Sequence, residues 1–200
     1  MEIIKTSPQS LAKANTILKK GGVIICPTDT VYGFLADATN KKAVEKIYKI
    51  KKRPKGKPLP VFVSGITMAR QLAVVDARAA KQFKKHWPGA YTFVLKRKTS
   101  NSTNSTAVDF VELHGVGKDT IALRVPKNTF LQKLLKKMGR PLVQTSVNLA
   151  GQEPLNSIAD IATTFGKNRL IDLMIDGGRA KNAKSSKILD LITRHLTIIR

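Results

Sequence analysis

The sequence predicts an α/β protein that folds as one domain around a twisted, mixed β-sheet with flanking helices. Apolar runs typical of strands alternate along the chain with segments whose apolar residues recur at helical spacing. The length of 200 residues suits one ordinary domain, and we find neither an internal repeat nor a linker-like segment. Hydrophobic residues make up 42% of the chain, enough for a sizeable core. We therefore expect residues 1–200 to form one domain.

Three segments in the first half of the chain carry clear signals of their type. Residues 8–20 have apolar side chains at helical spacing and precede two glycines, which predicts a helix and its end. The apolar run at 23–27 predicts a buried strand. Asn40 can cap a helix that runs to about Ile50, because the prolines that follow prevent its continuation.

The same signals predict the remaining elements. They are strands at 59–63, 90–96, 120–126 and 141–146, helices from Asp76 to His86, from Asn128 to Met138 and at 157–165, and closing strands at 170–176, 187–192 and 196–200. The polar, low-complexity stretch at 99–106 is expected to be a mobile loop.

The charge balance points to anionic partners. Lys and Arg number 36 against 13 Asp and Glu, a formal net charge of +23. Such a charge attracts RNA, nucleotides or anionic lipid, although much of it can also be a solubilising coat. Composition alone does not separate a nucleic-acid binder from an enzyme with an anionic substrate. No apolar run approaches the roughly 20 residues of a membrane span, and the N-terminus lacks a signal-peptide pattern, so we expect a cytoplasmic protein.

Several familiar kinds of catalytic site are absent from the sequence. It has no P-loop, no GxGxxG after the early strand, no HExxH and no GxSxG. The histidines are isolated, and His86 is expected to have a packing or surface role. The only cysteine, Cys26, ends an apolar run and is expected to be buried and inert. No metal ligands are predicted.

The most basic stretch of the chain directly follows the predicted helix that starts at Asn40. Residues 49–60, KIKKRPKGKPLP, contain six cations and three prolines. Lys51 and Arg53 alternate, so both would face one side if the backbone were extended. A planar Arg fork beside a Lys point charge suits a polyphosphate. The alternative is a solvated basic turn.

Other cations and small polar side chains lie near the ends of predicted strands. Thr120 and Arg124 share one face of a strand, and Ser146 and Asn148 share a face just after another. Each group alone could simply satisfy loop backbone. Together they suggest a preformed nucleotide pocket in an α/β fold. The further members of the set are Thr30 in PTDTVYG, Ser186 in SSKILD and Arg200 at the end of LTIIR.

Five segments, in order, resemble the YrdC family, the threonylcarbamoyl-AMP synthases of tRNA modification. They are PTDTVYGFLADATNKKAVEKIYKIKKRP, HWPGAYTFVL, IALRVP, TSVNLAG and IDGGRA. The resemblance extends from about Gly21 to Arg200 and is to the short, single-domain bacterial form. The family's K-x-R…S-x-N tetrad is matched by Lys51, Arg53, Ser146 and Asn148.

The resemblance implies a nucleotidyltransferase. Family members condense L-threonine, bicarbonate and ATP into threonylcarbamoyl-adenylate and release pyrophosphate, and a partner enzyme complex then modifies the tRNA adenosine next to the anticodon. Mg²⁺ is expected with ATP, bridging its phosphates and needing few protein ligands. The protein itself has mainly to align the reactants and stabilise negative charge, which fits the scarcity of acid and base groups.

The resemblance also implies roles for individual residues. Lys51 and Arg53 would bind the triphosphate, and Ser146 and Asn148 would bind ATP and threonine where the two meet. The other expected binding residues are Thr30 for threonine, Arg124 for its carboxylate, Thr120 near the nucleotide, and Ser186 and Arg200 closing the pocket. The sequence departs from the family pattern at Lys57, Phe62, Ala150 and Lys187, and these departures bear on substrate affinity rather than on the tetrad.

Two other functions are consistent with the sequence. One is a non-catalytic module that binds tRNA or structured rRNA with the same basic concave surface. The other is a carbamoyl transferase that acts on another acceptor, which the change at Phe62 keeps open. Tyr32, Phe34 and Trp87 are expected to pack in the core rather than stack on adenine. Asp29 could approach a metal ion or stabilise its own loop.

Overall fold

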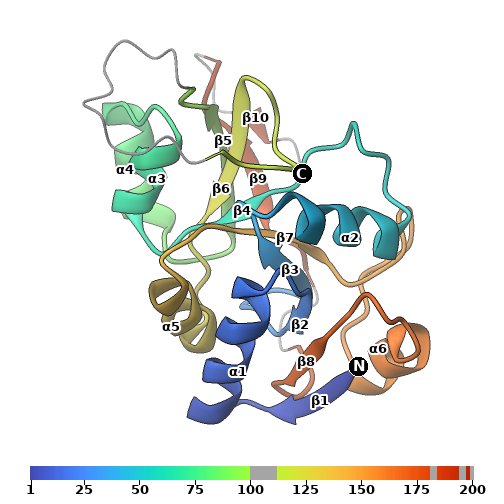
Figure 1. Ribbon diagram of the computed structural model, residues 1–200. Helices are drawn as coiled ribbons and strands as arrows, with labels where there is room; N and C mark the ends of the chain where they lie inside the picture. Colours follow the sequence, from blue (N-terminus) through green and yellow to red (C-terminus); the bar gives the residue numbers. More distant parts are fainter. Residues whose placement is uncertain (100–111, 181–183, 194–196, 199–200) are drawn as a thin grey trace.

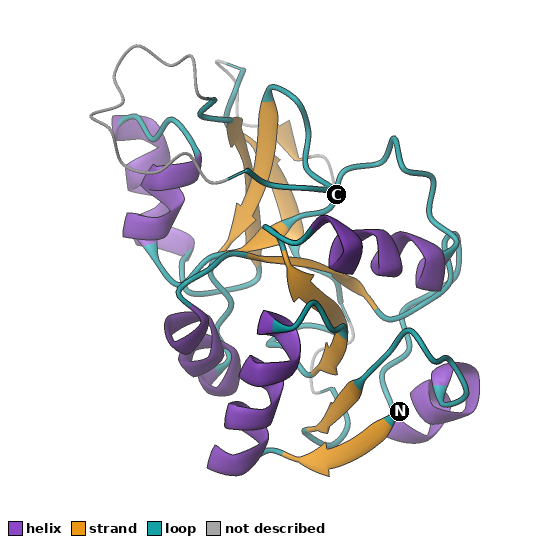
Figure 2. Ribbon diagram, in the orientation of Figure 1, coloured by secondary structure: helices purple, strands orange, loops and turns teal. Residues whose placement is uncertain are grey.

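The computed structural model describes residues 1–99, 112–180, 184–193 and 197–198. Within these residues one mixed sheet of ten strands has the order β1-β8-β2-β3-β7-β4-β6-β5-β9-β10. Six helices flank it (Figures 1 and 2). The strands pair both parallel, as in β4 with β6, and antiparallel, as in β5 with β6. The predicted α/β class with a mixed sheet is therefore confirmed.

The strands are β1 (Glu2–Lys5), β2 (Ile24–Cys26), β3 (Gly33–Asp37), β4 (Val61–Phe62), β5 (Tyr91–Lys96), β6 (Thr120–Arg124), β7 (Leu142–Ser146), β8 (Leu173–Asp176), β9 (Lys187–Asp190) and β10 (Thr197–Ile198). The helices are α1 (Pro8–Lys19), α2 (Lys41–Lys51), α3 (Ile66–Leu72), α4 (Ala77–His86), α5 (Thr129–Met138) and α6 (Ile158–Phe165).

The helices begin where side chains can satisfy their first free N–H groups. Asn40, Asp76 and Asn128 each accept a hydrogen bond from the backbone three residues on, at the starts of α2, α4 and α5. Ser7 and Ser157 do the same for α1 and α6. All five helices predicted from sequence are present. The short α3 was missed because Gly65 before it offers no side-chain cap.

Two strands were also missed, and both depend on pairing with distant residues. β3 lies between β2 and β7 and is buried along its whole length. Its sequence, GFLAD, follows a hydroxyl-rich loop and shows no alternation of polar and apolar residues. β1 is an edge strand that pairs only with β8, and most of it is exposed. The expected loop at 99–106 lies, beyond Thr99, outside the described residues.

Two apolar clusters fill the two faces of the sheet. Successive strand residues alternate between the faces, as in β2, where Ile24 and Cys26 join one cluster and Ile25 the other. α1 and α5 lie side by side on the Cys26 face, whereas α2 and α6 cover the other (Figure 1). Cys26 is fully buried, as expected, and burial raises the pKa of its thiol.

The aromatic residues have the packing roles that the sequence suggested. Tyr32 and Phe34 are fully buried, and Phe34 meets Phe165 edge to face. Trp87 stacks on Phe83 with ring centroids 4.0 Å apart. None of the described helices is long and apolar enough to cross a membrane.

Candidate active site

One cavity of about 500 Å³ collects the polar residues that the sequence singled out. A volume of this size is typical of small-molecule sites. The predicted site residues that line it are Thr30, Lys51, Arg53, Thr120, Arg124, Ser146, Asn148 and Ser186. The ninth, Arg200, lies outside the described residues.

The strands bring these residues together through their two-residue repeat. Thr120, Ala122 and Arg124 occupy alternate positions of β6 and all line the cavity, so the expected shared face is confirmed. Val94 of β5 pairs with Ala122 and lines the cavity beside it. Ser146, the last residue of β7, continues into the 147–151 loop on another side of the cavity.

The backbone conformation at Lys51 differs from the extended one considered in the sequence analysis. Lys51 is the last residue of α2, and Lys52 adopts a left-handed conformation with φ of 52°. The backbone is therefore not extended at Lys51, so the condition under which Lys51 and Arg53 were expected to face one side is not met, because α2 runs one residue past Ile50. The left-handed turn nevertheless leaves both Lys51 and Arg53 facing the same cavity.

The Lys51 side chain is buried and held by the end of β7. It is 2% exposed, and Nζ donates to the backbone oxygens of Ser146 (2.6 Å) and Asn148 (2.9 Å) and to Asn148 Oδ1 (2.8 Å). No carboxylate is paired with it among the described residues. Burial and the nearby Arg53 charge lower the Lys51 pKa to about 8.

Asn148 and Ser146 complete this first cluster. Asn148 Nδ2 donates to the backbone oxygens of Leu149 (2.8 Å) and Gln152 (2.7 Å), which orients the amide. Ser146 Oγ donates to Asn148 Oδ1 at 2.6 Å. We define Lys51, Ser146 and Asn148 as the lysine cluster.

Arg53 stabilises the basic loop that forms the rim of the cavity. Nε donates to the Lys57 oxygen (3.1 Å) and Nη2 to the Pro58 oxygen (2.9 Å). Nη1 has no acceptor among the described residues. Lys57 also lines the cavity, so two cations lie along this rim.

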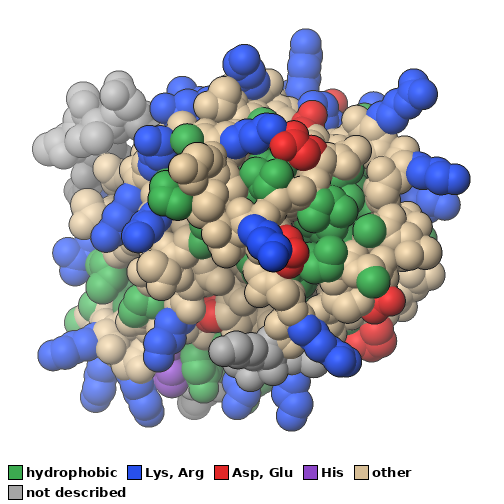
Figure 3. Space-filling model, turned by 90° about the horizontal axis from the view of Figure 1, so that it is seen from below, with side chains coloured by type: hydrophobic (Ala, Val, Ile, Leu, Met, Phe, Trp, Pro, Cys, Tyr) green, Lys and Arg blue, Asp and Glu red, His purple; other side chains and the backbone are tan. Residues whose placement is uncertain are grey.

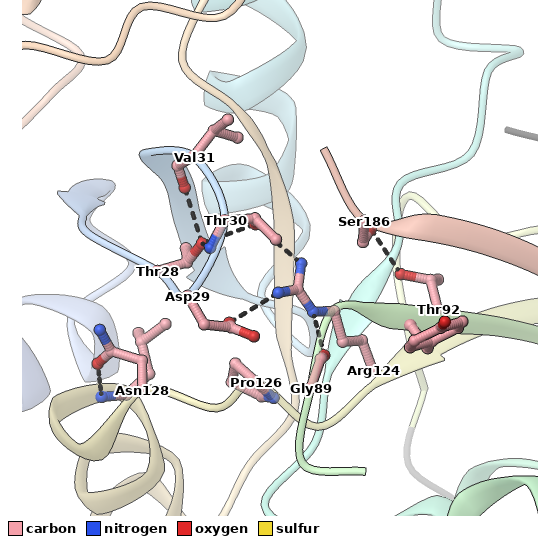
Figure 4. A network of polar contacts seen from close by, with 12 residues as sticks. Thr28, Asp29, Thr30, Val31, Gly89, Thr92, Arg124, Pro126, Asn128 and Ser186 are labelled. Carbon is pink, nitrogen blue, oxygen red and sulfur yellow. Dashed lines mark hydrogen bonds and ion pairs between the residues drawn. The ribbon is translucent and has the colours of Figure 1, made fainter. Parts of the chain in front are cut away.

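Arg124 forms the second cluster, shown in Figure 4. It is 2% exposed and donates from Nη2 to Asp29 Oδ1 (2.7 Å), from Nη1 to Thr30 Oγ1 (3.1 Å) and from Nε to the Gly89 oxygen (3.0 Å). Asp29 thus pairs with an arginine here, which agrees with a role in stabilising its loop. We define Arg124, Asp29 and Thr30 as the arginine cluster.

The Thr30 hydroxyl donates its hydrogen to another residue of its own loop, Thr28. Thr28 Oγ1 donates to the Val31 oxygen (2.8 Å), so in the contact between the two threonine hydroxyls (2.9 Å) Thr30 must be the donor. Thr30 Oγ1 accepts from Arg124 and can accept again from a ligand. Sequence reasoning missed the role of Thr28, although it belongs to the same PTDTVYG segment.

Ser186, another of the predicted site residues, lines the cavity directly before β9. Ser186 is buried, and its hydroxyl is 3.0 Å from that of Thr92 (Figure 4). Thr92 also was not singled out from the sequence. Its position in the alternation of β5, facing Ser186, is decided by the parallel pairing of β5 with β9.

The four departures from the family pattern fall in different surroundings. Lys57 and Ala150 line the cavity. Phe62 is fully buried behind it, with its ring centroid 5.5 Å from the Arg124 guanidinium carbon. Lys187 is exposed, and its Nζ lies over the Tyr91 ring. Only two of the four can therefore touch a ligand directly.

Comparison with known proteins identifies the family. The Sua5/YciO/YrdC family model, described as "Telomere recombination", matches residues 16–200. A Marinobacter nauticus protein named threonylcarbamoyl-AMP synthase is 33% identical over 186 residues, which are 92% of this chain and 92% of that protein.

Two solved structures are similar over the whole chain. P. abyssi Sua5 complexed with L-threonine has a TM-score of 0.84 at 28% identity, and the match covers 100% of this chain but only 56% of that longer one. E. coli YciO has a TM-score of 0.82 at 28% identity, with 100% and 92% covered. The resemblance inferred from the motifs is confirmed, and the chain belongs to the Sua5/YciO/YrdC family.

Proposed function

We propose that this protein is a threonylcarbamoyl-AMP synthase, which forms threonylcarbamoyl-AMP and pyrophosphate from L-threonine, bicarbonate and ATP. The observation that carries the proposal is the single cavity that brings Lys51, Arg53, Ser146 and Asn148 together with Arg124. Names of relatives that match almost end to end support the same activity. The transfer of an adenylyl group makes it a nucleotidyltransferase.

The cavity suits a reaction that needs alignment more than proton transfer. Bicarbonate takes up a proton and loses water to give carbon dioxide, and the threonine amine attacks this carbon and releases a proton to give a carbamate. A carbamate oxygen then displaces pyrophosphate from the α-phosphorus. Negative charge accumulates on the phosphates. Nη1 of Arg53, which has no acceptor within the described part of the chain, and the Lys57 ammonium can stabilise it. Holding the reactants together replaces much of the entropic cost of the reaction.

At the other end of the cavity, Arg124 and Thr30 suit the amino acid. Arg124 carries a permanent positive charge that attracts a carboxylate. Thr30 Oγ1 offers an acceptor to a ligand hydroxyl or amino group. Ser186 and Thr120 line the side between the two ends, where a nucleoside has polar groups to meet.

We expect Mg²⁺ to enter with ATP, as part of the substrate. The described residues contain no group of three or more His, Cys, Asp or Glu that could hold a metal ion. The described lining is cationic or neutral and includes no carboxylate. Such a donor set suits the phosphates of a metal–nucleotide complex better than a resident divalent ion.

The test is threonine-dependent release of pyrophosphate. Purified protein with ATP, Mg²⁺, bicarbonate and L-threonine should release pyrophosphate, and omission of either threonine or bicarbonate should stop the release. Replacement of threonine by other amino acids separates this activity from that of a carbamoyl transferase with another acceptor. Release that does not depend on threonine would contradict the proposal.

The RNA-binding module is the less favoured alternative. Figure 3 shows Lys and Arg side chains distributed over the face it presents rather than gathered in one patch, as expected of a coat that keeps the protein in solution. The buried hydrogen bonds of the lysine cluster have no use in simple attraction of phosphate. Handing the product to a tRNA-modifying transferase complex, in the cytoplasm where tRNA lies, completes the proposed role.

A further inference from the structure

A second cavity, of about 450 Å³, lies between α2, the 55–58 loop and the 114–118 segment. Its volume is within the range of small-molecule sites. Pro58 and Gly117 line both this cavity and the first one, so the two are neighbours. None of the eight predicted site residues that line the first cavity also lines the second. The proposed reaction therefore leaves the second cavity without a role.

A wall of hydrogen-bonded backbone separates the two cavities. Tyr48 Oη donates to the Lys57 oxygen (3.0 Å) and lies 3.4 Å from the Gly115 oxygen. The same Lys57 oxygen accepts from Arg53 Nε on the side of the first cavity. The Leu59 N–H donates to the Gly115 oxygen at 2.7 Å. The second cavity is thus a compartment of its own, next to the one that Arg53 lines.

The inner surface of the second cavity is apolar. Val44 and Tyr48, both buried, contribute to it from α2, and Pro58 and Val116 contribute from the two loops. Gly115 has φ of 71°, and a Cβ there would lie 2.6 Å from Val44 Cγ1. The 114–118 segment can therefore lie directly against α2 only because residue 115 is a glycine. This lining offers a ligand an apolar surface between the helix and the loops.

The charges around this apolar surface are mostly positive. The cavity is lined by three lysines, among them Lys41 and Lys118, and by one carboxylate, that of Glu45. Lys41 is the first residue of α2, and Lys118 comes two residues before β6, so the two cations belong to different walls. None of the ion pairs among the described residues involves these three charges. Lysine ammonium groups without a carboxylate partner suit a phosphate, to which they bind as point charges.

We propose that the second cavity binds a phosphate carried on a flat apolar ring, which is the chemistry of a mononucleotide. Lys41 and Lys118 bind the phosphate, and Val44 and Tyr48 contact the ring. The lysines disfavour a neutral ligand, and the apolar lining favours a ligand with a ring over a bare phosphate ion. The inference goes beyond the proposed function and does not depend on it, because this ligand binds in addition to the substrates.

The test follows His114, which lines the second cavity, by proton NMR at constant pH during a titration with phenyl phosphate. The chain has three histidines, and the signals that disappear in a His114→Gln variant are those of His114. Phenyl phosphate should shift these signals with saturation. The shift should be the same in Arg53→Met, because Arg53 lines only the first cavity. Signals that do not shift, shift without saturation, or shift only when Arg53 is present would overturn the proposal.

Two comparison ligands separate the contributions of the ring and the phosphate. Inorganic phosphate has the charge without the ring, and benzyl alcohol has the ring without the charge. Each should bind at least about tenfold more weakly than phenyl phosphate, judged by the concentration that half-saturates the His114 shift. Inorganic phosphate that binds as tightly as phenyl phosphate would reduce the cavity to a general attraction for anions. Benzyl alcohol that binds as tightly would remove the role of the lysines.

A pair of double variants tests the two lysines. Lys41→Ala/Lys118→Ala should weaken phenyl phosphate binding by about tenfold or more, because charge-assisted contacts are lost. Lys42→Ala/Lys49→Ala is the matched control, since both side chains are exposed on α2 and line neither cavity. It should change the binding by no more than about threefold, because salt screens distant charges. Equal losses in the two double variants would overturn the assignment. Glu45→Gln should tighten binding, and weaker binding in this variant would contradict the charge argument.

Binding to the first cavity shows whether these variants keep their fold. Inorganic tripolyphosphate is the probe, measured by calorimetry, because Arg53 is expected to bind it there. Its affinity should stay within about threefold in both double variants. A larger loss in Lys41→Ala/Lys118→Ala alone would place these lysines at the first cavity and contradict the proposal.

The outcome is separate from the test of the proposed function. Protein that releases pyrophosphate with threonine, but shows no saturable His114 shift, would support the synthase and overturn the second site. Protein that shows the shift with the expected dependence on Lys41 and Lys118, but releases no pyrophosphate, would support the second site and contradict the synthase.

Discussion

The two buried cations of the cavity have the same exposure but opposite electrostatic surroundings. Lys51 and Arg124 are each 2% exposed, and each lies near a phenylalanine ring, Phe34 or Phe62. Arg124 is paired with the carboxylate of Asp29 at 2.7 Å. Lys51 is surrounded by neutral oxygens and by the like charge of Arg53.

Two equally buried cations can therefore be accommodated in two ways, by pairing with a carboxylate or by a lowered pKa. An arginine cannot lose its proton, so a buried guanidinium needs a compensating carboxylate to stay stable. A lysine can lose its proton, so the lysine cluster tolerates an uncompensated charge at the cost of a lower pKa. The cation of the arginine cluster is paired with a carboxylate before a ligand binds, whereas the lysine cluster and the nearby Arg53 have no paired carboxylate among the described residues, an excess of positive charge that suits the phosphates.

The largest effect should come from breaking the balanced cluster. Arg124→Met removes the guanidinium that pairs with the Asp29 carboxylate, whose side chain is 12% exposed. The free energy of unfolding should fall by about 3–5 kcal/mol, as is common when one partner of a buried pair is removed. Denaturant unfolding measures the loss. The double variant Arg124→Met/Asp29→Asn should recover part of it, and a double variant as unstable as the single one would contradict the charge argument.

The second largest effect should come from Arg53, which lines the cavity near the lysine cluster. Arg53→Ala should lower kcat/KM by about 10²–10³, because a donor to developing charge is lost. The melting temperature should change little, since the side chain is partly exposed. Lys55→Ala is the matched control, because it removes an exposed cation of the same loop that does not line the cavity. Similar kinetic losses in both variants would mean that Arg53 acts only through general charge.

The pH dependence of stability should show which cluster can titrate. The Lys51 pKa is lowered from 10.5 to about 8, so between these values the unfolded chain binds a proton that the folded chain has lost. Stability should therefore rise with pH above pH 8, by at most about 1.4 kcal/mol per pH unit. Lys51→Met should lack this rise.

Other buried groups limit the pH window. Burial raises the Cys26 pKa from its ordinary 9.0, so above pH 9 the unfolded chain loses a proton that the folded chain keeps, and the rise should level off. Above pH 10 burial likewise raises the pKa values of Tyr32 and Tyr48, and stability should fall. Cys26→Ala should extend the rise toward pH 10. Denaturant unfolding from pH 7.5 to pH 10 measures these slopes, and a flat wild-type profile between pH 8 and pH 9 would contradict them.

The smallest effect should come from Thr28, whose hydroxyl contacts that of Thr30 in the arginine cluster. Thr28→Val removes the acceptor of the Thr30 hydrogen and the donor to the Val31 oxygen. Unfolding should become easier by about 1 kcal/mol, the net value of a typical hydrogen bond. Threonine binding should weaken slightly, while tripolyphosphate binding stays unchanged. A change in tripolyphosphate binding would show that the two ends of the cavity are not independent.

Much of this arrangement was readable from local sequence signals. The caps at Asn40, Asp76 and Asn128 mark helix starts because a side-chain oxygen there needs only neighbouring backbone N–H groups. The alternation in β6 placed Thr120 and Arg124 on one face because successive strand residues point to opposite sides. The backbone at Lys51 was misjudged, since proline at 54 limits where a helix can continue but does not decide whether it ends at residue 50 or 51.

By itself the sequence determined the fold class, most of the elements and eight of the polar residues that line the cavity, because periodicity, caps and motif spacing are local properties. Only the tertiary structure decided the partners: Lys51 with a loop about 95 residues away, Asp29 with Arg124, and Ser186 with Thr92. Such pairings follow from the order of strands in the sheet. A side chain's donors and acceptors can be counted only after that order has brought distant segments within hydrogen-bond distance.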